Sequence, residues 1–291
     1  MSCQPGILEP VPAAARYLRL QRRPDVDPRP ALRSLAGASI GGDVFGLGPT
    51  LVRELDGAIP GLRELPALAG PGVAAPATPA ALWCWLRGDD RGALLHRGRA
   101  LAERLAAGFY VEDVVDGFRY DRGLDLTGYE DGTENPEGAR AVEAAIAAGL
   151  GPGLDGSSFV AVQRWRHELD RFAALPGEAQ DHVFGRRRAD NEELDDAPPS
   201  AHVKRTAQES FTPEAFVVRR SMPWADDRGE GLIFVAFGRT LDPFEALLRR
   251  MLGLEDGITD ALFRFTRPVT GGAFWCPPCV DGRLDLSALG L

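Results

Sequence analysis

The chain has 291 residues, of which 44% are apolar, and this suffices for two compact domains or one large one without disulfide or metal staples. A net charge of −9 and a pI near 5.1 give an average surface that attracts neither nucleic acid nor an anionic membrane, so neither is an expected partner. No window approaches the roughly 18 to 20 apolar residues of a membrane-spanning helix, and the N-terminus lacks a signal-peptide pattern, so we expect a soluble, cytoplasmic protein.

Two halves of the chain show a similar order of elements. The first half predicts strands at 15–21, 80–88 and 110–120 and a helix at 93–108. The second half predicts strands at 157–169, 214–224, 231–240 and 271–276 and an amphipathic helix at 243–254. This order predicts an α+β fold in which antiparallel sheets pack together with helices outside. A joint is expected near 140–157, and 186–200 is expected to be a long loop, a kind of segment that is often functional.

The stretch "GYEDGTENPEG" at 128–138 contains one acid that local structure does not explain. Asn135 is expected to cap a helix that begins at Pro136 and extends to Gly149. Asp131 is not needed for that helix. An Asp-Gly pair is also common in turns, so a turn role and a functional role both stay open for Asp131.

Four histidines and four cysteines limit the possible metal and thiol sites. No histidine pair has i, i+4 spacing and the cysteines do not form two CxxC couples, so we expect no zinc site. His202, at the end of the long loop, is the histidine best placed to project into a cleft. Cys276 and Cys279 in "WCPPC" leave a thiol oxidoreductase open, although no βαβ pattern follows them.

An arginine pair stands in "FVVRRSMPW". Adjacent residues on a strand face opposite sides, so one of Arg219 and Arg220 is expected to point inward while the other meets water. A buried arginine needs a charged partner, which an inward carboxylate or an anionic cofactor would supply.

These stretches together resemble the dye-decolorizing peroxidases. The resemblance covers nearly the whole chain, in order through "QPGILEPVP", "GYEDGTENP", "SSFVAVQRWRHEL", "SAHVKRT", "VVRRSMPW", "GLIFVAFGRT" and "LFRFTRPVTGGAFW". It implies two ferredoxin-like halves of the dimeric α+β barrel type, residues 1–150 and 151–291, with haem b held mostly by the second half. It also implies an enzyme that reduces hydrogen peroxide and oxidises small organic donors such as dyes and phenolics.

The resemblance assigns expected roles to individual residues. His202 is the expected proximal iron ligand, and Asp260 is expected to accept a hydrogen bond that fixes its tautomer and makes it more electron-donating. Asp131 is expected to move a proton between the two oxygens of peroxide, and Arg219 to stabilise charge on the leaving oxygen. Arg220 is expected to face outward.

The same resemblance implies further cofactor contacts and possible electron-transfer residues. The expected contacts are Leu232 and Phe234 in the distal wall, Ser221 as a partner of distal water, and Arg186 as a haem-propionate partner or, alternatively, a surface charge. Trp275, Trp165 and Tyr129 are candidates for passing electrons to the surface, or are simply core residues.

Two other functions stay open, namely a haem-handling protein that carries haem or releases its iron, and the thiol oxidoreductase. Asp131 and Arg219 favour catalysis over carriage, because a carrier needs no peroxide chemistry. A homo-oligomer is expected from the resemblance. The tail "RLDLSALGL" at 283–291 is expected to close the fold as a strand or helix turn, the alternative being a peptide that loads an encapsulin shell.

Overall fold

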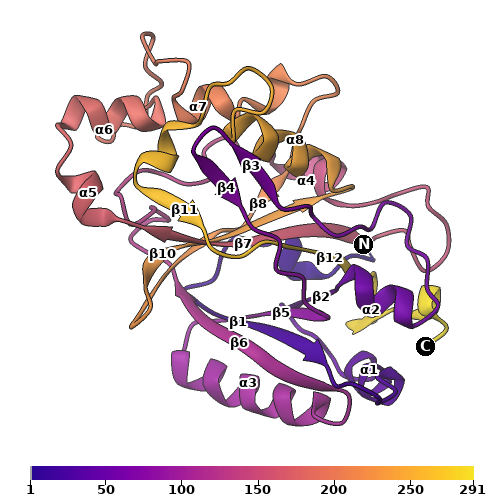
Figure 1. Ribbon diagram of the computed structural model, residues 1–291. Helices are drawn as coiled ribbons and strands as arrows, with labels where there is room; N and C mark the ends of the chain where they lie inside the picture. Colours follow the sequence, from indigo (N-terminus) through magenta and orange to yellow (C-terminus); the bar gives the residue numbers. More distant parts are fainter. Residues whose placement is uncertain (1) are drawn as a thin grey trace.

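The computed structural model describes residues 2–291, which form a mostly antiparallel β structure with helices around it (Figure 1). The helices are α1 (Arg29–Ala36), α2 (Pro49–Glu54), α3 (Arg91–Leu105), α4 (Gly138–Ala145), α5 (Leu169–Ala173), α6 (Gly177–Phe184), α7 (His202–Arg205) and α8 (Asp242–Met251). The strands are β1 (Ala14–Arg22), β2 (Val44–Leu47), β3 (Leu68–Gly70), β4 (Val73–Ala75), β5 (Leu82–Gly88), β6 (Phe109–Phe118), β7 (Ser158–His167), β8 (Val218–Arg219), β9 (Met222–Asp226), β10 (Gly229–Gly238), β11 (Thr266–Pro268), β12 (Gly272–Cys276), β13 (Cys279–Val280) and β14 (Arg283–Leu284). Within residues 2–291, none of the helices combines the length and apolar character needed to cross a bilayer.

The main sheet closes into a barrel. Its strand order is β11-β7-β12-β2-β5-β1-β6-β9-β10-β8, and a further pairing of β7 with β10 completes a ring. Strands β1, β2, β5 and β6 of the ring come from the first half of the chain, and β7, β9, β10 and β12 come from the second. The predicted α+β fold with two joined halves is therefore confirmed. Closure of the ring pairs each of its eight strands on both edges, while β8 and β11 lie outside the ring.

Aromatic side chains fill the barrel. Tyr17, Trp83 and Trp85 lie with ring centroids 6.1 to 6.4 Å apart, and Phe237 and Phe274 pack against the tryptophans. All five side chains are buried. Because neighbouring residues on a strand face opposite sides, the intervening residues of these strands face the outer helices, which explains the nearly continuous apolar run of β5.

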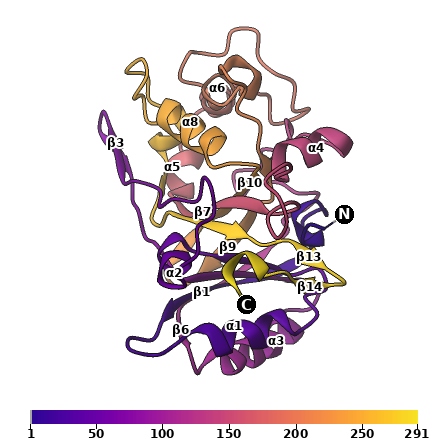
Figure 2. The same cartoon turned by 90° about the vertical axis from the view of Figure 1, so that its right-hand side faces the viewer.

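Helices cover two sides of the barrel (Figures 1 and 2). Helices α1 and α3 pack together below the sheet, with α3 against β1, β5 and β6. On the other side, α8 packs on β10 and also contacts α7.

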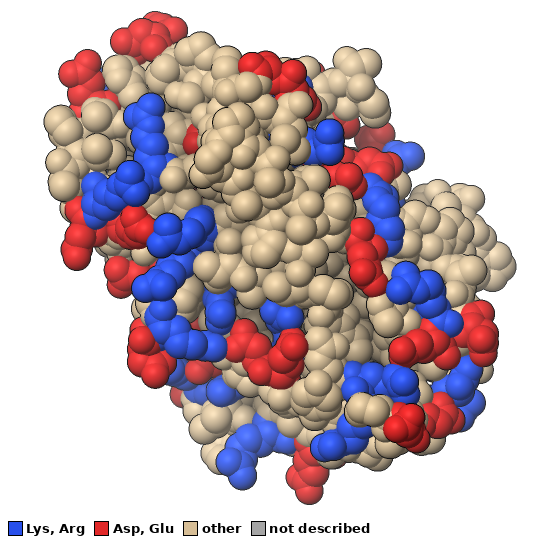
Figure 3. All heavy atoms as spheres, viewed as in Figure 1, with Lys and Arg blue, Asp and Glu red and all other residues tan. Residues whose placement is uncertain are grey.

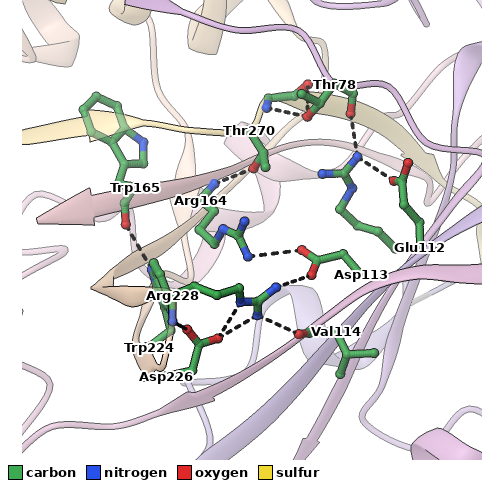
Figure 4. Close-up of polar contacts among 12 residues, drawn as sticks. Thr78, Glu112, Asp113, Val114, Arg164, Trp165, Trp224, Asp226, Arg228 and Thr270 are labelled. Atoms are coloured by element: carbon green, nitrogen blue, oxygen red, sulfur yellow. Dashed lines mark hydrogen bonds and ion pairs between the residues drawn. The ribbon is translucent and has the colours of Figure 1, made fainter.

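Side chains reinforce the seam where the two halves meet at β6 and β9. These strands pair at Gly117 and Trp224. Beside this pair, Asp113 of β6 accepts hydrogen bonds from Arg164 of β7 at 3.2 Å and Arg228 at 2.7 Å (Figure 4). One carboxylate thus bridges two arginines of the second half. Acidic and basic side chains are interspersed over the face of the molecule in Figure 3.

Two predicted elements differ from those observed by more than three residues or are divided. The helix expected from Pro136 to Gly149 is α4, which ends at Ala145 because Ile146 adopts an extended conformation. The strand expected over 214–224 is divided into β8 and β9, and between them the amide of Val235 donates to the Ser221 hydroxyl, at 3.4 Å.

The C-terminal tail closes the fold, as predicted. Strands β13 and β14 pair, and the 3-10 turn Ser287–Leu289 follows. Leu284, Leu286 and Leu289 are buried against the main core. Loading into an encapsulin shell stays a prediction, and it would have to involve a tail that is packed on the protein.

Candidate active site

A cavity of about 1280 Å³, counting the solvent at its mouth, lies between the sheet and the second helical layer. Side chains of β7, β8, β10 and β11 line one wall, and side chains of α7 and α8 line the other. Its lining is mainly apolar, with contributions from Trp165, Leu232, Phe234, Phe244, Leu247, Leu248, Met251, Leu262 and Phe265. Such a concave apolar space with a few polar groups is typical of a cofactor site.

His202 enters the cavity from the helical wall, at the start of α7. Its Nδ1 lies 2.8 Å from Oδ2 of Asp260, whose side chain is 0% exposed. An ionised carboxylate only accepts hydrogen bonds, so in the neutral ring this contact requires the proton on Nδ1 and leaves the lone pair on Nε2. Nε2 has no hydrogen-bond partner within residues 2–291. A neutral imidazole oriented in this way is a ready metal ligand.

Backbone contacts fix the position of Asp260. Its Oδ1 accepts a hydrogen bond from the Leu262 amide at 2.9 Å, and its own amide donates to the Met251 carbonyl at 2.8 Å. The next amide, that of Ala261, donates to the Ser200 carbonyl at 2.8 Å, close to His202. The acid and the histidine are therefore held together by backbone as well as by side chains.

Asp131 and Arg219 meet on the other wall. Arg219 lies on β8 and Asp131 on the loop before α4, and Nη1 of the arginine is 3.9 Å from Oδ1 of the acid. Their side chains are 16% and 23% exposed, so solvent screens this pair only in part. The pair is close enough to attract but too far apart for a hydrogen bond.

Asn135 does not cap a helix, contrary to the prediction. Helix α4 is preceded by Glu137, whose side chain makes no capping bond. The Asn135 side chain instead bonds the backbone of Arg219, with Oδ1 accepting from the amide at 2.7 Å and Nδ2 donating to the carbonyl at 3.1 Å. An asparagine followed by proline fits either arrangement, and only the tertiary contact distinguishes them.

The other predicted contacts are divided between two adjoining cavities. Leu232, Phe234 and Arg186 line the main cavity, and Arg186 also pairs with the carboxylates of Glu134 and Glu193. Ser221 lies outside it and lines a second cavity of about 660 Å³. Asp131, Gly132, Arg219 and Leu232 line both cavities, so the acid and the arginine stand where the two spaces meet.

The expectation that Arg220 faces water is wrong. Its guanidinium is half-buried and donates to the carbonyls of Leu8 and Arg219, at 2.8 and 3.0 Å. Burial, and secondarily the charge of Arg87, lowers the pKa of Arg220. The alternation of a strand put Arg220 on the opposite side from Arg219 as predicted, but the N-terminal segment covers that side.

A buried histidine and acid on the cavity wall were not predicted. Nε2 of His167 lies 3.0 Å from Oδ2 of Asp125, and Nδ1 lies 2.7 Å from the Thr266 hydroxyl. Burial alone would raise the pKa of Asp125, but the hydrogen bond and charge of His167, together with Thr127, lower it below its ordinary value. The partners are 42 residues apart, and neither lies in a motif that indicates a pair.

The three candidate electron-transfer residues occupy different environments. Tyr129 and Trp165 line the cavity, whereas Trp275 is fully buried in the main core. The Tyr129 hydroxyl donates to Asp181. Burial, and then this acid, raise the pKa of Tyr129. Their role in electron transfer stays a prediction.

The "CPPC" cysteines lack the surroundings of a reactive thiol. Cys276 ends β12 and Cys279 begins β13, so no helix N-terminus follows the first cysteine. Both are buried free thiols, and burial raises the pKa of each. A raised pKa keeps a thiol protonated and unreactive, which removes the physical basis for thiol catalysis at this motif.

Comparison with known proteins gives a consistent result. A family model described as "Dyp-type peroxidase, C-terminal" matches residues 122–281. A dye-decolorizing peroxidase of Mycolicibacterium paratuberculosis is 36% identical over 255 residues, which cover 85% of this chain and 70% of that protein. A dye-decolorizing protein from V. cholerae superimposes with a TM-score of 0.86 at 28% identity, over 99% of both chains. A DypB variant from Rhodococcus jostii RHA1 in complex with heme has a TM-score of 0.84 at 27% identity, over 93% of this chain and 94% of that one. The chain therefore belongs to the Dyp-type peroxidase family.

Proposed function

We propose that this protein is a haem b peroxidase that reduces hydrogen peroxide and oxidises small organic donors. The proposal rests on one observation: two polar pairs lie on opposite walls of one apolar cavity. His202 pairs with Asp260 on one wall, and Asp131 pairs with Arg219 on the other. The similar R. jostii DypB variant is in complex with heme, and this agrees with a cofactor role for the cavity. When bound, haem would supply the redox chemistry.

The residues of the helical wall would bind the haem iron. The unpartnered Nε2 of His202 is the atom that would ligate the metal, and the buried Asp260 orients the ring by accepting the hydrogen bond of Nδ1. Arg186 would neutralise a carboxylate of the cofactor, in competition with Glu134 and Glu193. Leu232 and Phe234 would form the apolar surface on the peroxide side.

Asp131 and Arg219 would act on peroxide itself. The Asp131 carboxylate would accept a proton from one oxygen of hydrogen peroxide and return it to the other oxygen, which leaves as water. Arg219 stabilises the negative charge that develops on the departing oxygen. Both residues line the two adjoining cavities, so a small solute in either cavity would meet both groups.

The test compares R219L and D131N with the wild type after haem reconstitution. We expect both variants to keep the His202-dependent Soret band, while Arg219→Leu slows the reaction with peroxide by about 100- to 1000-fold. H202A should lose the band. If R219L and D131N both react with peroxide at the wild-type rate, the proposed roles of these residues are wrong.

Haem handling without turnover is the remaining rival. It predicts that the reconstituted wild type shows a Soret band that one equivalent of peroxide leaves unchanged. The charged pair facing the cavity argues against it, because a carrier gains nothing from a half-buried arginine and acid beside its ligand. Homo-oligomer formation and a cytoplasmic location stay predictions, and light scattering of the purified protein tests the former.

A further inference from the structure

The outer edge of β8 is closed by side chains instead of by another strand. On its inner edge β8 pairs with β10, where Arg219 lies opposite Ala236. On its outer edge, Asn135 binds both the amide and the carbonyl of Arg219. Two residues earlier, the Val217 amide donates to Oε1 of Gln208 at 2.9 Å. Two side-chain amides therefore satisfy the polar groups of an edge that carries a candidate catalytic arginine.

Gln208 also reaches the loop that carries Asp131. Its Nε2 donates to the Glu134 carbonyl at 2.9 Å, and its side chain is almost fully buried. The loop is thus attached to the strand at two consecutive residues, Glu134 through Gln208 and Asn135 directly. We call these two residues, Asn135 and Gln208, the amide clamp.

The loop between the clamp and Asp131 is short and closed. The Asn135 amide donates to the Gly132 carbonyl at 2.9 Å, which ties the clamp to the residue directly after Asp131. Gly132 has φ of 81°, and a Cβ atom there would lie 2.7 Å from Nδ2 of Asn135. Asp131 therefore has little freedom to move once Asn135 is bound to the strand.

The two charged side chains do not hold each other in place. At 3.9 Å their ion pair lacks the hydrogen bond that would set a direction, whereas the Asn135 bonds are 2.7 and 3.1 Å long. Their positions must therefore come from the backbone contacts. Arg219 and Asp131 lie 88 positions apart in the sequence, so no local structure joins them.

We infer that Asn135 and Gln208 are positioning residues that set the separation of the Asp131 carboxylate and the Arg219 guanidinium, an inference that rests on the function proposed above. Each amide uses both of its ends, the oxygen toward an N–H group and the nitrogen toward a carbonyl. An acid of the same shape would lose the donor and place oxygen against a carbonyl oxygen. The site therefore requires an amide and not merely a polar side chain.

The test uses the one-atom changes Asn135→Asp and Gln208→Glu, with Glu137→Gln as the matched control on an exposed residue nearby. Three quantities are measured: the second-order rate constant with peroxide, the fluoride dissociation constant of the reconstituted protein, and amide exchange at Val217 and Arg219 in the apoprotein. For N135D we expect a rate about 100-fold lower, because a displacement near 1 Å has about this effect. Fluoride should bind about 10-fold or more weakly, since the Arg219 guanidinium would no longer be held in the position from which it can donate to a bound anion. Q208E should shift both constants in the same direction, and E137Q should change neither by more than about twofold.

The outcomes separate this inference from the proposed function. If R219L and D131N slow the reaction but N135D and Q208E leave the rate and fluoride binding unchanged while Arg219 exchange becomes faster, the clamp is structural only and the inference is wrong. If R219L and D131N themselves have no effect, the proposed function fails instead. Should N135D not bind haem, Asn135→Ser gives the same comparison, because serine keeps a polar group without reaching both backbone partners.

Discussion

Replacing Asp260 by asparagine gives the sharpest test of the helical wall. Oδ1 of Asp260 accepts from the Leu262 amide, so the new amide oxygen must face Leu262 and its NH₂ group must face His202. Two donors cannot share that contact, so the imidazole has to place its proton on Nε2. The nitrogen that would ligate iron then no longer has a free lone pair.

The expected loss follows from this forced change of tautomer. Removing the partner of a metal-ligating histidine typically weakens metal affinity or activity by about 10- to 100-fold, which corresponds to about 1.4 to 2.7 kcal/mol. Asp260 is completely buried, so solvent cannot replace the lost acceptor and the upper end is expected. A histidine that donates fewer electrons also raises the midpoint potential, by about 59 mV for each tenfold change in relative affinity of a one-electron couple.

The assay is titration of the apoprotein with haem, followed by redox titration of the loaded protein. Glu255→Gln is the control, because it removes one charge from the neighbouring loop while Glu255 contacts Arg250 instead of His202. A D260N protein with wild-type haem affinity and potential would refute the tautomer argument. Asp260→Ala distinguishes the cause, since it removes the acceptor without forcing the proton onto Nε2 and should affect affinity less than D260N.

Three further predictions concern the rest of the chain. Asp125→Asn should lower the free energy of unfolding. Because the pKa of Asp125 is depressed in the folded state, the difference in this free energy from the wild type should be complete above about pH 5 and should shrink as the pH falls below it. Urea unfolding that gives the same difference at pH 5 and pH 3 would contradict this. None of the four cysteines should react rapidly with a thiol reagent in the native protein, and all four should react after unfolding, because all are buried with raised pKa values. Leu286→Ala should destabilise the protein by about 2 to 5 kcal/mol, since this side chain of the tail is 2% exposed, and a loss below 1 kcal/mol by denaturant titration would mean that the tail is not part of the core.

Four candidate site residues could be proposed from the sequence because each stands in a long stretch that matches the family in order. Asp131, His202, Arg219 and Asp260 line or support one cavity, as the resemblance to the family implied. The contacts that hold these residues could not be predicted from the sequence, because they join residues that are far apart in the chain. Asn135 reaches Arg219 across 84 positions, and its sequence context is equally suited to a helix cap.

The elements between 29 and 75 were missed for a similar reason. Strand β2 contains Gly46, which weakens any strand pattern, yet a Cβ atom there would lie 2.7 Å from Cβ of Phe274. The glycine is therefore required by the close approach of β12 in the closed barrel. Local propensity cannot reveal such a requirement, because the partner strand lies more than two hundred residues later.

Strand β10 couples the stability of the barrel to the shape of the site. Its residues Ile233 and Phe237 pack in the barrel interior, whereas Leu232 and Phe234 face the cavity. A shift of one residue in its register with β7 would exchange the two sets, placing cavity residues in the aromatic core. The dense packing of that core thus fixes the register of β10 and with it the cavity wall. Arg219 is part of this wall, because it pairs with Ala236 of β10. The helical wall is not part of the sheet, and α7 has only four residues, so the position of His202 depends on its bond to Asp260 and on the backbone bonds that hold Asp260 and Ala261.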